Sequence, residues 1–172
     1  MEFIIKEMQP DHWEQVREIY LEGLATDQAS FEIDAPTWEE WDQSHHKHSR
    51  LVVSYEGRVI AWAALALVSH RKCYAGVAEV SLYVAHSYRG KGVGKRLLQA
   101  LIEVSESNSI WSLCGSTFPE NTASLHMQSE FGFRVVGRRE RIAQRYAIWH
   151  DTLITERRSK VVGINDHVSK DV

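Results

Sequence analysis

The sequence predicts an α/β (α+β) domain in which helices flank a central mixed, mostly antiparallel sheet. Two observations predict this class. Residues 50–55 and 58–68 have the pattern of two strands joined by Glu56-Gly57, which is a β-hairpin. Residues 79–84, 93–104 and 110–116 have the pattern of strand, helix and strand, which is a crossover connection. A sheet that combines hairpins with a crossover contains both strand directions.

The first part of the chain predicts a short strand and two helices. Residues 3–5 are apolar and predict the strand. Pro10-Asp11 then opens a helix. The apolar positions of that helix share one face: Trp13, Val16, Ile19, Tyr20 and Leu24. Thr37 and Glu40 form a capping box, which predicts the start of a second helix.

The second predicted helix ends in three histidines, His45, His46 and His48. Histidines at this spacing can share a metal ion on a helix. The neighbouring sequence, however, supplies neither a further ligand nor an H-E-x-x-H pattern. We therefore expect a solvated helix end and no metal.

The last part of the chain predicts a helix and a strand pair. Asn121 is a favoured residue for starting a helix, and Gly132 for ending one. Residues 133–136 and 146–154 then predict an antiparallel pair. The apolar pattern stops at Thr155. We expect one domain over residues 1–157 and a polar tail over residues 158–172.

Composition excludes several classes of protein. A net charge of −3 over 172 residues gives no general attraction to nucleic acid or to an anionic membrane. The sequence has no apolar run long enough for a membrane helix and no leader pattern at its start.

Cys73 and Cys114 lie in apolar segments and predict free thiols in a reducing cytoplasm. Trp62, Trp111 and Trp149 lie in strand patterns, so we expect them in the core.

A glycine-rich turn, Arg89-Gly90-Lys91-Gly92-Val93-Gly94, separates the strand 79–84 from the helix that follows. Free backbone amides at a helix start and the positive end of the helix dipole favour a phosphate. The spacing does not fit a Walker A loop, because Arg89 stands where the first glycine belongs and Arg96 follows Lys95. It fits the dinucleotide fingerprint only weakly, since Gly90 and Gly92 match but Lys95 occupies the third glycine position.

A strand followed by Arg-Gly-x-Gly-x-Gly resembles the acetyl-CoA pyrophosphate loop of the GNAT N-acetyltransferase superfamily. Asn121-x-x-Ser124 followed by Phe131-Gly132-Phe133 resembles a second segment of that superfamily. More narrowly, the chain is similar to the phosphinothricin and methionine sulfoximine N-acetyltransferases over residues 3–157. The similar positions are Ile19-Tyr20, Ser30-Phe31-Glu32, Arg71-x-x-Tyr74, Glu79-x-Ser81-x-Tyr83-Val84 and Trp149-x-Asp151. Two positions depart from the family: Gln128 replaces a usual His, and Val77 replaces a usual Thr.

The resemblance implies acetyl-CoA as co-substrate, in a GNAT acyl-CoA N-acyltransferase fold. It implies that the backbone of Leu82, Tyr83 and Val84 pairs with the pantetheine arm, and that the Val84 amide polarises the thioester carbonyl. The pyrophosphate is expected on the turn and the helix start, with charge from Arg89 and Lys95. That segment consists of Arg89, Gly90, Lys91, Gly92, Val93, Gly94 and Lys95.

Asn121 and Ser124 complete the expected cofactor contacts, although an Asn in this position is equally a plain helix cap. Many GNAT enzymes place a Tyr in the following helix to protonate the leaving thiolate, and this chain has none between Asn121 and Phe133. Ser124, a water molecule or no acid at all are the remaining options, because a thiolate is a fair leaving group at neutral pH.

Glu79 is the candidate catalytic residue, a general base for the acceptor amine. The alternative interpretation is that Glu79 is an ordinary carboxylate at the end of a strand. Arg71 and Tyr74 precede it, and a guanidinium there suits the carboxylate of an acceptor amino acid. Phe31 and Glu32 match the substrate-pocket segment of the family; a core Phe and a solvated Glu remain the alternative.

These residues predict direct attack of a small amino acid analogue on acetyl-CoA within a ternary complex, as in the phosphinothricin and methionine sulfoximine enzymes. The alternatives are a GNAT enzyme for another amine, such as a polyamine, an aminoglycoside or a protein N-terminus, and a non-catalytic acetyl-CoA sensor. The resemblance also implies a homodimer. No nucleic-acid or membrane partner is expected.

Overall fold

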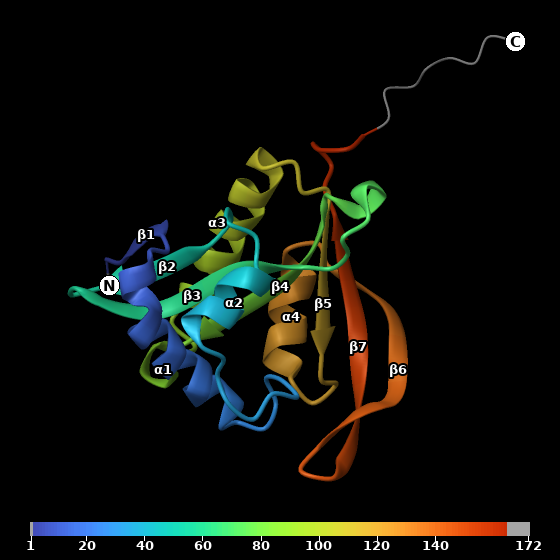
Figure 1. Cartoon of the computed structure of the whole chain (residues 1–172), viewed down its shortest axis with the longest axis horizontal. Helices are drawn as coiled ribbons and strands as arrows, with labels where there is room; N and C mark the ends of the chain where they lie inside the picture. Colours follow the sequence, from blue (N-terminus) through green and yellow to red (C-terminus); the bar gives the residue numbers. More distant parts are fainter. Residues whose placement is uncertain (1, 165–172) are drawn as a thin grey trace, which may run out of the picture.

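The computed structural model describes residues 2–164, which form one twisted seven-stranded sheet with helices on both faces (Figure 1). The strand order is β1-β2-β3-β4-β5-β7-β6. All neighbouring strands are antiparallel except β4 and β5, which are parallel. The strands are β1 (Ile4–Glu7), β2 (Leu51–Tyr55), β3 (Arg58–Leu67), β4 (Val77–Val84), β5 (Ser112–Thr117), β6 (Arg134–Arg145) and β7 (Ile148–Arg158). The predicted mixed, mostly antiparallel sheet is therefore confirmed.

Each face of the sheet is covered by its own pair of helices. The α-helices are α1 (Trp13–Leu24), α2 (Trp38–Ser44), α3 (Val93–Ser107) and α4 (Thr122–Glu130). Single 3-10 turns precede α1, β4 and α3: η1 (Pro10–His12), η2 (Lys72–Tyr74) and η3 (His86–Tyr88). α1 and α2 pack on the face that carries Trp62, while α3 and α4 pack on the face that carries Ile60 and Leu65. No helix within residues 2–164 is both long and apolar enough to cross a membrane.

The capping box predicted for α2 is present. The Thr37 hydroxyl accepts from the Glu40 amide at 3.3 Å, and the Glu40 carboxylate accepts from the Thr37 amide at 2.9 Å. The predicted end of this helix is wrong, because α2 stops at Ser44 and His45 is already extended. His45 forms a bridge to Ala66 at the end of β3, so the chain leaves the helix to join the sheet.

The last two strands are longer than the apolar pattern predicts. β6 runs to Arg145, although most of its side chains are exposed and charged. β7 continues past Thr155 to Arg158 because it is paired on both sides, with β5 and with β6. Thr155 and Ser159 are buried, so the chain stays packed against the domain beyond the point where the apolar pattern stops. The part of that tail over residues 165–172 lies outside the described residues.

Two expectations about side chains in the core need correction. Trp62 is buried, but Trp149 is 56% exposed because it lies near the free end of the β6–β7 hairpin. Cys73 is exposed rather than in an apolar setting, and both cysteines are free. Trp111 is half-buried and covers Gly76, whose added Cβ would lie 2.1 Å from the indole ring.

Candidate functional site

A cavity of about 1330 Å³ opens where β4 and β5 diverge. The two strands pair at only three positions, from Val77 with Ser112 to Glu79 with Cys114. Beyond Glu79, the described part of the chain provides no further β4–β5 pairs, although β4 continues to Val84. One backbone edge of the second half of β4 therefore faces the cavity, which is also lined by α4 and by the segment between α1 and α2.

The glycine-rich turn lies at one end of this cavity, before α3. Gly90 and Gly92 have φ values of +71° and +79°, which side-chain-bearing residues rarely adopt, and Gly92 is the N-cap of α3. Gly94 allows α3 to approach its neighbours closely, because an added Cβ would lie 3.3 Å from Met127 Sδ. The amides at the start of a 15-residue helix thus face the cavity end with no side-chain cap.

The charged side chains at the turn differ in whether they reach the cavity. Arg89 lines the cavity and donates from Nε to the Val84 carbonyl at 3.0 Å. Lys95 also lines it, and its Nζ lies 2.8 Å from the Glu130 carboxylate. Lys91 lies instead over the Tyr88 ring at 5.3 Å. Val93 is buried in the core, so only its backbone is available to a ligand.

Glu79 lies in the opposite half of the cavity, just before the strands diverge. Its side chain is accessible from the cavity, and the surrounding protein atoms raise the pKa of its carboxyl above 4.5, while the positive charge of Arg139 opposes that rise. A carboxyl with a raised pKa in a cleft is a better proton acceptor than an ordinary one.

Phe31 forms an aromatic wall with residues from the other side of the cavity. Its ring meets the Phe118 ring edge-on at 4.8 Å, and the His150 imidazole lies 5.2 Å from Phe118. Glu32 follows Phe31 and also lines the cavity. The structure therefore brings the two predicted pocket residues of this segment to the cavity that contains Glu79.

Arg71 and Tyr74 are not brought to this cavity. Both are exposed at the η2 turn, where the Arg71 guanidinium lies 5.3 Å from the Tyr74 ring. Neither belongs to the cavity wall, although they precede Glu79 closely in sequence. Sequence proximity to Glu79 and the family resemblance were the grounds for expecting them at the site, and in this structure the turn carries their side chains away from the cavity.

Tyr83 belongs to an aromatic cluster under the middle of the cavity. Its ring stacks on Trp62 at 4.9 Å and meets Tyr20 edge-on at 4.9 Å. Burial raises the pKa of the Tyr83 hydroxyl far above its usual value, so it stays protonated. The helix α1 approaches through Gly23, whose added Cβ would lie 2.5 Å from the Tyr83 ring.

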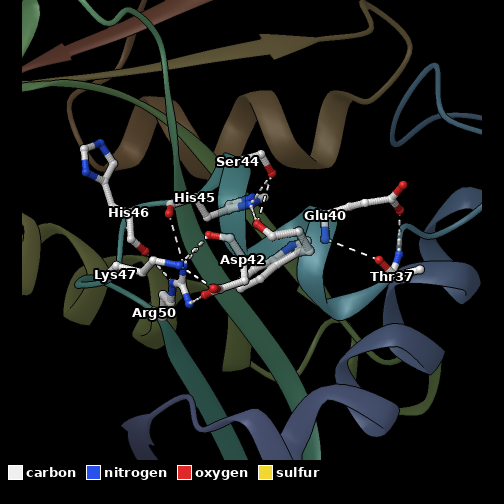
Figure 2. Close-up of polar contacts among 9 residues, drawn as sticks. Thr37, Glu40, Asp42, Ser44, His45, His46, Lys47 and Arg50 are labelled. Carbon is white, nitrogen blue, oxygen red and sulfur yellow. Dashed lines mark hydrogen bonds and ion pairs between the residues drawn. The ribbon is translucent and has the colours of Figure 1, made fainter.

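The end of α2 forms another part of the wall. Figure 2 shows the polar contacts around this helix end. His45 stacks on Trp41 at 4.1 Å, and burial lowers the pKa of its imidazole to about 4. Arg50 is buried and binds the end of the helix, donating to Asp42 Oδ1 at 2.6 Å and to the His45 carbonyl at 3.0 Å. His45 is therefore a neutral, packed residue rather than part of a solvated helix end. Within the described residues, no group of His, Cys, Asp and Glu is arranged to hold a metal ion.

Comparison with known proteins identifies the family to which this arrangement belongs. The model of the acetyltransferase (GNAT) family matches residues 11–133. The chain belongs to the GNAT acetyltransferase family. The matched segment includes the glycine-rich turn, Glu79 and Asn121, which are the positions that carried the resemblance in the sequence.

Several GNAT proteins are similar to this chain. YwnH of Bacillus subtilis, provisionally named a phosphinothricin acetyltransferase, is 33% identical over 125 residues, covering 70% of this chain and 77% of that protein. The L-methionine sulfoximine/L-methionine sulfone acetyltransferase of Pseudomonas paraeruginosa is 30% identical over 95 residues, covering 55% of each chain. A GNAT superfamily phosphinothricin acetyltransferase from Sinorhizobium meliloti, solved with acetyl-CoA, has a TM-score of 0.83 at 21% identity, covering 100% of this chain and 98% of that one. The last comparison shows the shared GNAT fold.

In this GNAT domain, Asn121 caps α4 and also contacts the segment over the cavity. Its Oδ1 accepts from the Ser124 amide at 3.2 Å, and its Nδ2 donates to the Gln28 carbonyl at 3.2 Å. Gln128 donates to the Ser124 hydroxyl at 3.2 Å and accepts from the Thr155 hydroxyl at 2.6 Å. The residue that replaces the usual His is thus part of a hydrogen-bonded network between α4 and β7.

Sequence reasoning missed Arg145, which fixes the cavity segment of this GNAT domain. Arg145 is 4% exposed and reaches from the end of β6 to the segment between α1 and α2. Its guanidinium donates to the carbonyls of Leu24 (2.8 Å), Ser30 (3.1 Å) and Glu32, and to Asp27 Oδ1 at 2.9 Å. An arginine in an otherwise charged strand gives no sequence signal of burial, because its partners are more than 100 positions away.

Proposed function

We propose that this chain transfers the acetyl group of acetyl-CoA to the amine of a small amino acid or amino acid analogue. The single observation that carries the proposal is the cavity between the diverging strands, which has the Glu79 carboxylate near one end and the start of α3 at the other. The family assignment and the phosphinothricin and methionine sulfoximine relatives support the same reaction and acceptor class.

The cofactor is proposed to lie along β4. The amides that begin α3 are suited to the pyrophosphate, since they are uncapped and stand at the positive end of the helix dipole. Arg89 and Lys95 add positive charge at that end. The edge of β4 over Leu82, Tyr83 and Val84 that is not paired with β3 offers hydrogen bonds to the extended amide arm, as an added strand would receive, although the Val84 carbonyl already accepts from Arg89. The Asn121 side chain lies beside this path, although it is already engaged as a helix cap.

Glu79 is proposed to act as the general base. Acetyl transfer requires a neutral amine, and a carboxylate with a raised pKa accepts the ammonium proton directly or through water. The amine then attacks the thioester carbon and a tetrahedral oxyanion forms near the Val84 amide. The C–S bond breaks to release CoA thiolate, and the nitrogen gives its second proton to the thiolate or to water. A positioned base contributes a factor of about 10² to 10⁴ in rate.

The test is release of free CoA thiol from acetyl-CoA with a panel of amines. The panel contains phosphinothricin, methionine sulfoximine, methionine sulfone, spermidine, an aminoglycoside and a short peptide. We expect release with the first three, and a loss of about 10² to 10⁴ in kcat/KM for Glu79→Gln. Glu18→Gln, an exposed change on α1, is the matched control and should leave the rate unchanged. Release with spermidine or peptide alone would overturn the acceptor class, and silence with every amine would overturn catalysis.

The homodimer implied by the sequence resemblance is also proposed, through the β6–β7 hairpin. β6 is an edge strand, and this hairpin exposes the apolar side chains Ile142, Tyr146, Ile148 and Trp149. We expect light scattering to give twice the mass of the chain, and Trp149→Ser to shift that mass toward a monomer. A single-chain mass at high concentration would refute the dimer.

A further inference from the structure

Thr152 carries a hydroxyl that the fold buries without a protein partner. The residue is 2% exposed, and its Oγ1 has no hydrogen-bond partner among the described residues. Thr152 also belongs to the wall of the cavity that contains Glu79. Buried hydroxyls are nearly always hydrogen-bonded in proteins, so a lone one within a cavity wall points to a polar ligand atom as its missing partner.

Arg139 lies next to this hydroxyl on the neighbouring strand. Arg139 of β6 and Thr152 of β7 are paired directly across the antiparallel ladder, so their side chains project from the same face. The Arg139 side chain is exposed, and no ion pair is recorded for it among residues 2–164. Other arginines of β6 already face carboxylates: Arg134 with Glu156, Arg138 with Asp151 and Arg145 with Asp27.

The register places Glu79 on that same face. Glu79 is paired with Cys114 on β5, and Cys114 is paired with Glu156 on β7. Thr152 precedes Glu156 by four positions, and side chains an even number apart in a strand share a face. Burial raises the pKa of both Glu79 and Cys114, and the positive charge of Arg139 opposes the rise at both residues, which agrees with its position over this part of the sheet.

We propose that Arg139 and Thr152 form the subsite that holds the carboxylate of an amino acid acceptor. This proposal rests on the proposed acetyl transfer at Glu79. A carboxylate accepts from the guanidinium and from the Thr152 hydroxyl together, which gives the hydroxyl the partner that the fold does not supply. An α-amino acid carries its amine one carbon from that carboxylate, and Glu79 on the same face receives the amine.

This assignment differs from the one that the sequence alone favours. Arg71 was the expected carboxylate ligand, and it lies outside the cavity with its guanidinium over Tyr74. Arg139 is not part of the cavity wall either, but it is paired with Thr152, which is, and its charge acts on the Glu79 carboxyl although 60 positions separate the two residues in sequence. Glu32, on the other side of the cavity, is left to face the positively charged amine.

The experiment compares two acceptors that differ only in the carboxylate: methionine sulfone and its decarboxylated amine. We expect Arg139→Gln to raise KM for methionine sulfone by about ten- to a hundredfold with little change in kcat, because a charge-assisted contact is lost. KM for the decarboxylated amine should not change. Arg139→Lys should recover part of the loss, and Thr152→Val should raise KM for the amino acid alone. Arg141→Gln is the control, since it removes a neighbouring exposed charge of the same strand.

The outcomes separate this subsite from the reaction on which it rests. Normal turnover of methionine sulfone with unchanged KM in Arg139→Gln and Thr152→Val would overturn the subsite and leave the acetyltransferase intact. A wild type that prefers the decarboxylated amine would overturn the subsite as well. No thiol release with any amine would overturn both proposals. Melting temperatures close to wild type for both variants would exclude a folding defect as the cause of a raised KM.

Discussion

Arg145→Met tests whether one buried guanidinium holds the segment over the cavity. The substitution keeps an unbranched side chain of similar length and removes the donors to three backbone carbonyls and to Asp27. We expect the segment that contains Phe31 and Glu32 to lose its fixed position, because Arg145 is the one recorded donor to the Ser30 and Glu32 carbonyls within the described chain, whereas the Leu24 carbonyl also accepts from the Asp27 amide.

The magnitude follows from the exposure of each partner. Asp27 is 66% exposed, so water screens its ion pair with Arg145 and the pair contributes less than about 1 kcal/mol. The carbonyls are neutral and in part regain water when the segment loosens, so each contact is worth about 1 kcal/mol rather than its full strength. A net loss of about 2 to 4 kcal/mol in the free energy of unfolding results, which corresponds to about 5 to 15 °C in Tm for a chain of this size.

The assay combines thermal unfolding with steady-state kinetics. We expect Arg145→Met to raise KM for the acceptor more than KM for acetyl-CoA, since the segment carries Phe31 and Glu32, which line the cavity and are the expected acceptor-pocket residues. Arg141→Met, at an exposed position of the same strand, is the matched control and should change the free energy of unfolding by less than about 0.5 kcal/mol. An unchanged Tm together with an unchanged acceptor KM in Arg145→Met would refute the reasoning.

Three further substitutions have definite expected outcomes. Folding raises the pKa of Glu79, so its ionisation costs stability as pH rises from 4.5 through the raised pKa, and Glu79→Gln should gain Tm relative to wild type at pH 8 but not at pH 4. Folding lowers the pKa of His45 from 6.5 to about 4, so the free energy of unfolding of the wild type should fall by up to roughly 3 kcal/mol as pH falls across that window. Urea titrations of His45→Gln should not show this fall. In Gly23→Ala the new Cβ would lie 2.5 Å from the Tyr83 ring, so we expect the free energy of unfolding to fall by about 1 to 3 kcal/mol and KM for acetyl-CoA to rise. The same KM in variant and wild type would contradict the close packing.

The elements that the sequence predicted correctly are those with local signals. The capping box of α2, the hairpin at Glu56-Gly57 and the turn before α3 are each specified by residues adjacent in the chain. β6 had no such signal, because exposed arginines on an edge strand do not alternate with apolar residues. β7 past Thr155 forms because β5 lies beside it, and that neighbour is 40 positions away in sequence.

The candidate site divides in the same way. Glu79, Arg89 and Asn121 lie within recognisable motifs, and the fold places all three on one cavity. Arg139 and Arg145 lie in no motif, and register and long-range packing alone give them their positions. The roles proposed for Glu79, Arg139 and Arg145 are the predictions that the substitutions above test.

The divergence of β4 from β5 has a consequence for how the molecule avoids self-association. A strand with unpaired backbone groups is a template for strands of other chains, and proteins usually shield such an edge with charge, a bulge or a covering loop. Here the unpaired edge is internal: it opens into a cavity between α4 and the α1–α2 segment instead of to bulk solvent. Elements of the same chain therefore stand beside this edge, where a strand of another molecule would have to lie in order to pair with it. The unpaired backbone groups are shielded from the strand pairing that leads to aggregation and are kept for a ligand inside the cavity.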